Sequence, residues 1–265
     1  MGYGTHHQGL SMTSLPHNAF KQAIKEGKPQ YGLWMASASP TIAEISADAG
    51  YDWMLVDGEH GPYDLNTILD VLRAVAPYDV TPIVRPAAAD PVLIKQVLDL
   101  GAQTLLLPMV NTKEEAELMV KAVNYAPEGI RGVGSPIARS GRWGRIPHYM
   151  RDAKNEICLL VQVESQEALD NIEEIASVDG IDGIFIGPAD LSASLGHPDD
   201  AAAIMDQIHH AFDVIKAHGK AIGSLAFDRP TVEKFYEWGA TFVAVAGDTD
   251  LYVRALTADI AQYKG

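Results

Sequence analysis

Residues 53–85 read WMLVDGEHGPYDLNTILDVLRAVAPYDVTPIVR. The stretch begins and ends with short apolar runs of the kind found in strands that are buried on both faces of a parallel sheet. Between these runs, apolar residues recur at helical spacing over residues 65–76. The stretch therefore predicts a strand, a helix and a second strand in direct succession, which is the repeating unit of α/β proteins.

The same alternation recurs along the rest of the chain. Strands are expected at residues 31–35, 53–56, 82–84, 104–108, 158–163, 183–186, 220–225 and 241–246. Helices are expected at residues 41–49, 65–76, 91–100, 113–124, 166–176, 200–218, 229–238 and 251–263. Eight repeats predict a (β/α)8 barrel of the TIM type, and a doubly wound open sheet is the alternative. No linker or shift in composition divides residues 12–265, so we expect a single domain.

The charge balance excludes several classes of partner. The 265 residues include 20 Lys and Arg and 35 Asp and Glu, which gives a net charge of −15. A nucleic-acid-binding surface or a surface for anionic lipids would show clustered Lys and Arg. The sequence has no apolar run of about 18 residues, the length that a membrane-spanning helix needs. We therefore expect neither a nucleic acid nor a membrane as a partner.

The cysteine content and the first residues say little about activity. Cys158 is the only cysteine and lies in an apolar run, so it is expected to be a buried, inert thiol in a cytoplasmic protein. Residues 1–11, MGYGTHHQGLS, have no hydrophobic pattern and are expected to be an added leader, with Met12 as the natural start. Removing them should leave activity intact.

Residues 126–152 are too long for an ordinary connection and are rich in Gly and Arg. The segment precedes the fifth strand, which places it on the face of a barrel opposite the chemistry. It is expected to be an irregular excursion that packs on the barrel or on a partner. The alternative is a basic loop that reaches the site of a neighbouring subunit.

Polar residues follow several of the expected strands. In a (β/α)8 barrel, the carboxyl ends of the strands form the face that carries the active site. Charged residues at such apolar strand ends are costly unless they are paired or bind a ligand. The polar residues at these ends are Asp57, Glu59, His60, Arg85, Gln162, Glu164, Asp190 and Asp248.

Glu164 and Asp190 end neighbouring strands and are the expected metal ligands. Two partly buried carboxylates repel each other, and a divalent cation removes that repulsion. Oxygen ligands favour Mg²⁺ or Mn²⁺, with Co²⁺ or Zn²⁺ also considered. Gln162 has the spacing that points it to the same side as Glu164. The alternative is an ion pair between these acids and Arg85 or a lysine.

Arg85 and His60 are the expected catalytic side chains. The guanidinium of Arg85 suits a carboxylate or a developing enolate, although a buried salt bridge to Asp57 or Glu59 is the alternative. His60 is the acid–base candidate because the pKa of histidine lies nearest neutrality. Asp57 is one candidate to orient His60, and Asp99, from another element, is a second.

A turn and two aromatic residues complete the expected substrate site. Gly187, Pro188 and Ala189 form a turn whose amide groups are placed to bind a carboxylate. Trp34 and Phe227 lie near the mouth and are expected to form an apolar wall for the variable end of a substrate. Both are also compatible with an ordinary role in the core.

Five motifs in order resemble one enzyme family. They are VDGEHG at 56–61, PIVR at 82–85, QTLLLPMV at 103–110, RGVG at 131–134 and GPADLS at 187–192. Together they are similar to the metal-dependent hydroxy-oxo-acid aldolases of the 4-hydroxy-2-oxoheptanedioate type, which are related to 2-dehydro-3-deoxyglucarate aldolase. The resemblance extends over nearly the whole chain from about residue 18.

The resemblance implies a carbon–carbon lyase of aromatic-compound catabolism, which cleaves 4-hydroxy-2-oxo acids to pyruvate and an aldehyde. It implies a divalent cation at Glu164 and Asp190, with pyruvate near Gln162, Arg85 and the turn amides. His60 would be the acid–base group, with Asp99, from a neighbouring subunit, as its partner. It also implies a homo-hexamer in which the C-terminal helix is exchanged between protomers.

Two alternatives remain open on the sequence. One is a barrel enzyme acting on phosphoenolpyruvate or an acyl-CoA oxo acid, which should show more phosphate-binding residues after the last two strands. The other is a non-catalytic protein that binds small carboxylates and would not need His60. No expected strand ends in lysine, since Lys220 begins its strand, so a Schiff-base mechanism is disfavoured.

Overall fold

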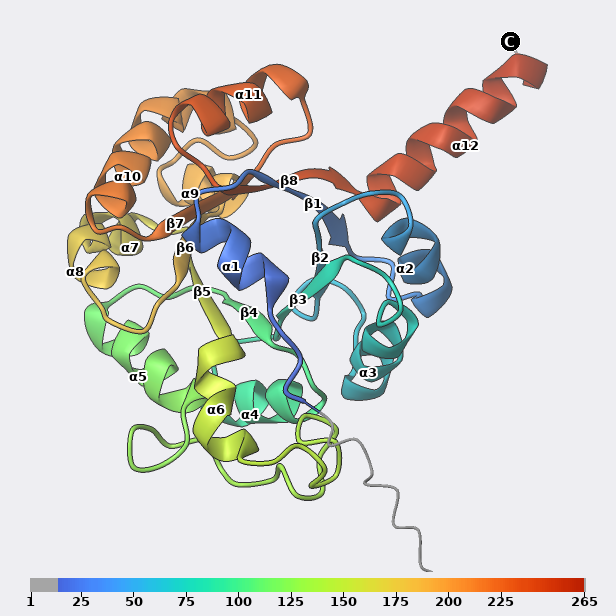
Figure 1. Cartoon of the computed structure of the whole chain (residues 1–265). Coiled ribbons are helices and arrows are strands. Elements are labelled where there is room, and N and C mark those ends of the chain that lie inside the picture. Colours follow the sequence, from blue (N-terminus) through green and yellow to red (C-terminus); the bar gives the residue numbers. More distant parts are fainter. Residues whose placement is uncertain (1–13, 265) are drawn as a thin grey trace, which may run out of the picture.

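Eight parallel strands close into a barrel in chain order (Figure 1). The structure is a computed structural model, and it describes residues 14–264. The strands are β1 (Gln30–Met35), β2 (Trp53–Asp57), β3 (Thr81–Arg85), β4 (Thr104–Leu107), β5 (Cys158–Val163), β6 (Gly183–Ile186), β7 (Ala221–Leu225) and β8 (Phe242–Gly247). The predicted (β/α)8 barrel is confirmed, and the open sheet is excluded.

Helices surround the barrel (Figure 1). They are α1 (Ala19–Lys25), α2 (Pro40–Ala47), α3 (Leu65–Ala74), α4 (Pro91–Asp99), α5 (Lys113–Val123), α6 (Tyr149–Glu156), α7 (Gln166–Asp170), α8 (Ile172–Ala176), α9 (Pro188–Ser194), the 3-10 helix η1 (Ala201–Ile204), α10 (Met205–Ala217), α11 (Arg229–Glu237) and α12 (Asp248–Lys264). The short helices α1, α6 and α9 were not predicted. The helix expected at 166–176 is divided into α7 and α8.

The period of two along each strand decides which side chains enter the barrel. Trp53 and Leu55 of β2 lie in the interior cluster, whereas Met54 and Val56 belong to the core under the helices. Helix α1 lies across one open end of the barrel in Figure 1 and adds Phe20 to the interior cluster. The same alternation then places the next inward positions, at the carboxyl ends of the strands, in the mouth of the barrel.

Two glycines make room for the large aromatic residues of the interior. A Cβ on Gly32 would lie 2.1 Å from the ring of Trp53, and one on Gly223 would lie 2.2 Å from Phe242. Both rings are almost fully buried. A small residue on one strand and a large one on its neighbour fill the barrel at native packing density.

Cys158 is buried, and its burial raises the pKa of its thiol, as expected for an inert cysteine. The cytoplasmic location stays a prediction. Among residues 14–264, no helix has both the length and the apolar character needed to cross a membrane. The expected leader at residues 1–11 lies outside the described residues.

The Gly- and Arg-rich segment follows an irregular path until α6 begins at Tyr149. Its Arg131 is 3 % exposed and forms an ion pair of 3.0 Å with Asp99, the last residue of α4. The guanidinium of Arg131 also lies 4.5 Å from the ring centre of Tyr125. In Figure 1 the segment lies beside α4 and α6, so it packs on its own barrel as predicted.

Helix α12 projects away from the barrel (Figure 1). Every side chain from Leu251 to Lys264 is exposed. Tyr252, Leu256, Ile260 and Tyr263 are 47–78 % exposed and recur at helical spacing along it. The helix therefore presents apolar surface that its own barrel does not cover. Exchange of this helix between protomers stays a prediction.

Candidate active site

Four polar side chains lie buried at the carboxyl ends of β2, β3 and β5. Asp57, Arg85, Gln162 and Glu164 are each 1–3 % exposed. Asp57 and Arg85 are paired in the register of β2 and β3, so their side chains enter the mouth side by side. Buried charges of this kind require partners, and these side chains are one another's partners.

Arg85 is fully engaged by its neighbours. Its Nε and Nη2 donate to the two carboxylate oxygens of Asp57 at 2.9 and 2.7 Å. Its Nη1 donates to Oε1 of Gln162 at 3.2 Å and lies 2.8 Å from Oε2 of Glu59, an ion-pair contact. The alternative of a buried salt bridge therefore describes this arginine, and it involves both acids. Arg85 contributes a fixed positive charge at the base of the site.

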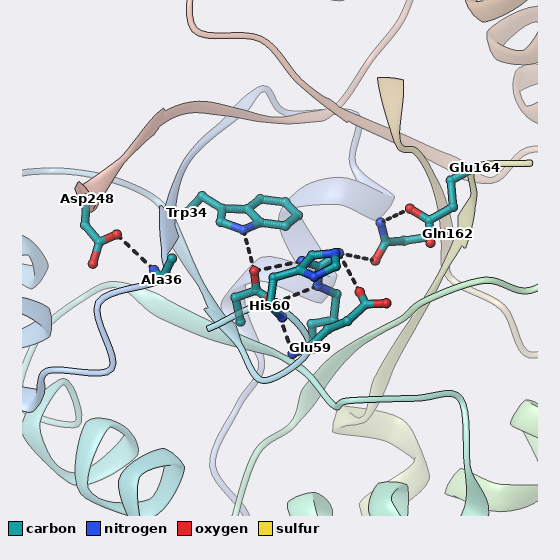
Figure 2. Close-up of polar contacts among 9 residues, drawn as sticks. Trp34, Ala36, Glu59, His60, Gln162, Glu164 and Asp248 are labelled. Atoms are coloured by element: carbon teal, nitrogen blue, oxygen red, sulfur yellow. Dashed lines mark hydrogen bonds and ion pairs between the residues drawn. The ribbon is translucent and has the colours of Figure 1, made fainter. Parts of the chain in front are cut away.

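Asp57 connects Arg85 to the loop that carries His60. Its carboxylate also accepts hydrogen bonds from Nε1 of Trp34 at 2.9 Å and from the backbone amide of His60 at 3.2 Å (Figure 2). Burial pushes the pKa of Asp57 upward, but the hydrogen bonds and charge of Arg85 outweigh this and hold it below its ordinary value. Asp57 thus holds the His60 backbone, and it forms no hydrogen bond or ion pair with the imidazole ring.

Within residues 14–264, the hydrogen bonds that Glu164 accepts come from two neutral donors, of which Figure 2 shows Gln162. Nε2 of Gln162 donates to its Oε2 at 2.9 Å, and the backbone amide of Met109 donates to its Oε1 at 2.9 Å. The pKa of Glu164 is raised to about 7. Burial is the largest cause, and the negative charges of Glu59 and Asp190 act in the same direction, whereas the Met109 amide lowers the pKa. A buried carboxylate with this surplus of negative charge around it is suited to bind a cation.

The loop after β6 approaches Glu164 so closely that only a glycine fits at its first position. A Cβ on Gly187 would lie 2.6 Å from Oε2 of Glu164 and 3.6 Å from Nε2 of Gln162. Pro188 then begins α9, and the first turn of that helix contains Ala189 and the exposed Asp190. The structure thus brings the two predicted metal ligands to adjoining strand ends, with no side chain between Gly187 and Glu164.

The described residues supply at most a partial coordination shell. Nowhere in residues 14–264 do three or more His, Cys, Asp or Glu side chains come together in a way that could hold a metal ion. Two carboxylates would leave most positions of a divalent cation to water and substrate, as catalytic sites for hard cations do. The donor set of Glu164 and Asp190 fits such an ion.

His60 is exposed and lies on the loop after β2, beside Glu59 (Figure 2). In the part of the chain that the structure describes, no hydrogen bond reaches its ring. The carboxyl group of Glu59 is half-buried, and burial raises its pKa although Arg85 and His60 counteract this. His60 therefore faces the open side of the site, where a substrate would approach.

The structure gives the surroundings of three further predicted residues, and their roles toward substrate or a neighbouring subunit stay predictions. Asp99 ends α4 and pairs with Arg131, so it does not meet His60 of its own chain. The ring of Trp34 lies 4.7 Å below the guanidinium of Arg85 and donates to Asp57, so it braces the charged pair. Phe227 is 47 % exposed after β7 and remains available to a substrate.

Two contributions were missed from the sequence. The backbone amide of Met109 binds Glu164, and no side-chain pattern indicates that. Asp248 is 6 % exposed, and its oxygens accept hydrogen bonds from the backbone amides of Ala36 at 2.9 Å, which Figure 2 shows, and of Ser37 at 3.1 Å. This carboxylate joins the end of β8 to the loop after β1. The sequence shows Asp248 as a polar residue at a strand end, but it does not show which groups this carboxylate binds.

Comparison with known proteins agrees with this geometry. The HpcH/HpaI aldolase/citrate lyase family matches residues 30–255. A 2-keto-3-deoxy-L-rhamnonate aldolase from Klebsiella pneumoniae is 51 % identical over 255 residues, which cover 96 % of each chain. A crystal structure of an HpcH/HpaI aldolase/citrate lyase family protein from Burkholderia cenocepacia has a TM-score of 0.89 at 34 % identity and covers 94 % of this chain and 100 % of that one.

A solved relative carries a different name. The citrate synthase SbnG has a TM-score of 0.83 at 30 % identity, and the match covers 92 % of this chain and 96 % of that one. The barrel alone therefore does not select the reaction, although the 51 % identical relative favours aldol chemistry. The predicted fold and reaction class are confirmed: this chain is an enzyme, a pyruvate aldolase among the carbon–carbon lyases, and it belongs to the HpcH/HpaI aldolase/citrate lyase family.

Proposed function

We propose that this chain catalyses the reversible, divalent-metal-dependent cleavage of 4-hydroxy-2-oxo acids to pyruvate and an aldehyde. The observation that carries the proposal is Glu164, a buried carboxylate near Asp190 that accepts hydrogen bonds from two neutral donors in the described part of the chain. By analogy with its 51 % identical relative, 2-keto-3-deoxy-L-rhamnonate is the first substrate to test.

Glu164 and Asp190 would hold the ion, and their oxygen donors favour Mg²⁺ or Mn²⁺ over softer metals. A divalent cation, when bound, polarises a carbonyl oxygen and stabilises charge that develops on it. Gln162 and the first turn of α9, with Pro188 and Ala189, would orient the carboxylate of the oxo acid.

Arg85 and His60 would complete the reaction. Arg85 is fixed by Asp57 and Glu59, so its charge needs no reorganisation when negative charge develops nearby. His60, on the open side, would remove a methyl proton from pyruvate in the synthetic direction. In the cleavage direction the same group would return that proton.

An assay of purified protein tests this proposal. A panel of 4-hydroxy-2-oxo acids, coupled to pyruvate detection, is expected to show turnover for at least one member. Treatment with EDTA should lower that rate by about a thousandfold or more, and Mn²⁺ should restore it, because Lewis-acid stabilisation contributes several kcal/mol. Turnover that survives thorough metal removal would contradict the metal role.

We also propose that the chain forms a homo-hexamer in which α12 packs against a neighbouring copy. The exposed stripe Tyr252, Leu256, Ile260 and Tyr263 supports this, and so do Val133 and Ile137, which are 61 % and 85 % exposed on the Gly- and Arg-rich segment. Sedimentation equilibrium of the full chain should give about six times 28.6 kDa. A mass of one copy would overturn the assembly.

A further inference from the structure

Met109 has a backbone conformation that its residue type disfavours. It follows Pro108 after β4, and its φ is 53°, in the left-handed region. A non-glycine residue there is uncommon, and the strain concentrates at functional sites in proteins. The side chain is 48 % exposed, so packing of the side chain does not account for the conformation.

The left-handed turn fits the loop of residues 109–111 against the end of β5. The amide of Met109 donates to Oε1 of Glu164 at 2.9 Å, and the amide of Val110 donates to the carbonyl of Gln162 at 3.2 Å. Asn111 then accepts a hydrogen bond from Oγ of Ser165 at 2.5 Å. Three successive residues thus bind three positions at the same strand end.

This loop and Gln162 together fix both oxygens of Glu164. Nε2 of Gln162 donates to Oε2, and the Met109 amide donates to Oε1. If the turn at Met109 adopted an extended conformation, its amide would point elsewhere, and the Oε1 atom would lose its donor. Glu164 would then be held through Oε2 alone, and its carboxylate could turn about that contact.

We propose that Met109 is a positioning residue, whose left-handed backbone aims its amide at Glu164 and so preorganises the metal site. The inference rests on the proposed function, since it concerns how the metal ligand is held. The effect belongs to the backbone, because the Met109 side chain is half exposed and makes no demand on the conformation.

Substitutions that differ in their tolerance of positive φ test this. Met109→Gly removes the side chain and Met109→Asn replaces it with a short polar one, and both accept the left-handed region, whereas Met109→Val disfavours it strongly. Mn²⁺ binding to the full chain is measured by electron paramagnetic resonance, alongside circular dichroism. Met150→Val replaces an exposed methionine on α6, away from the site, and serves as the matched control.

We expect wild type, Met109→Gly, Met109→Asn and Met150→Val to bind Mn²⁺ within about threefold of one another. Met109→Val should bind about ten- to a hundredfold more weakly, the effect typical of removing a group that orients a metal ligand. The Mn²⁺ concentration for half-maximal turnover should rise by the same factor. If Met109→Val does not fold, Met109→Ala takes its place with the same expected direction.

Two results would overturn the inference while wild type still binds Mn²⁺. One is wild-type affinity in Met109→Val or, where it is needed, in Met109→Ala. The other is an equal loss in Met109→Gly, which would assign the effect to the side chain. A wild-type chain that binds no Mn²⁺ would refute the proposed function together with this inference.

Discussion

Glu164→Gln is expected to remove Mn²⁺ binding and to lower turnover by about a thousandfold or more. The amide keeps the size of the side chain and can still accept from Met109, although its NH₂ group would face the Nε2 donor of Gln162 and lose that hydrogen bond. The packing of the barrel mouth should therefore remain intact. What disappears is the negative charge that attracts the cation. The loss of several kcal/mol of Lewis-acid stabilisation converts to at least three powers of ten in rate.

The same substitution should stabilise the metal-free protein. Burial raises the pKa of Glu164 from 4.5 to about 7, so the folded state binds this proton more tightly than the unfolded state does. The free energy of unfolding of the wild type therefore falls as the pH rises from about 4.5 to 7. At 1.36 kcal/mol per pKa unit, the loss is about 3 kcal/mol. Glu164→Gln has no such proton to lose and should unfold at a higher temperature at pH 8.

Glu174→Gln is the matched control, since Glu174 is an exposed acid on α8. It should leave Mn²⁺ binding, turnover and the melting temperature unchanged. Mn²⁺ binding by calorimetry, initial rates and thermal unfolding at pH 5 and pH 8 make the comparison. Full activity in Glu164→Gln would refute the assignment of the ligand.

The barrel and most of its mouth could be predicted because period-two alternation is visible in the sequence. Once the strand at 158–163 is recognised, Gln162 and Glu164 must lie on the same side as the interior residue Leu160. Likewise, Asp57 and Arg85 each end a strand, and neighbouring parallel strands bring their ends together. These predictions needed only local pattern and the handedness of the fold.

The partners of Arg85 could not be predicted, because they depend on register. Asp57 lies opposite Arg85 only because β2 and β3 pair without an offset, and Glu59 returns to the same guanidinium from the following loop. A one-residue shift would have separated them. The sequence offered both acids as candidates but could not show that both would bind.

Short helices and the Met109 turn were missed for a related reason. Helices α1 and α9 have seven residues each, and helices of that length form because they pack against the barrel. Phe20 of α1 illustrates this, since its ring is 1 % exposed within the barrel cluster. Methionine likewise has no preference for positive φ, so only tertiary contacts can impose it on Met109.

His60→Ala should lower turnover by about a hundred- to ten-thousandfold while Mn²⁺ still binds with wild-type affinity. General acid–base catalysis contributes effects of this size. The ring is exposed and has no hydrogen-bond partner among residues 14–264, so its removal should change the free energy of unfolding by less than about 0.5 kcal/mol. His210→Ala, on the exposed face of α10, is the control.

The exchange of pyruvate methyl protons in D₂O isolates the step assigned to His60. With Mn²⁺ present, wild type and His210→Ala should exchange these protons, as followed by proton NMR, without any aldehyde. His60→Ala should exchange them more slowly, by about a hundred- to ten-thousandfold, because the transfer of this proton by His60 is common to exchange and to cleavage. Exchange at the wild-type rate would exclude His60 as the base, and Glu59, whose pKa burial raises beside it, would then be the side chain to replace.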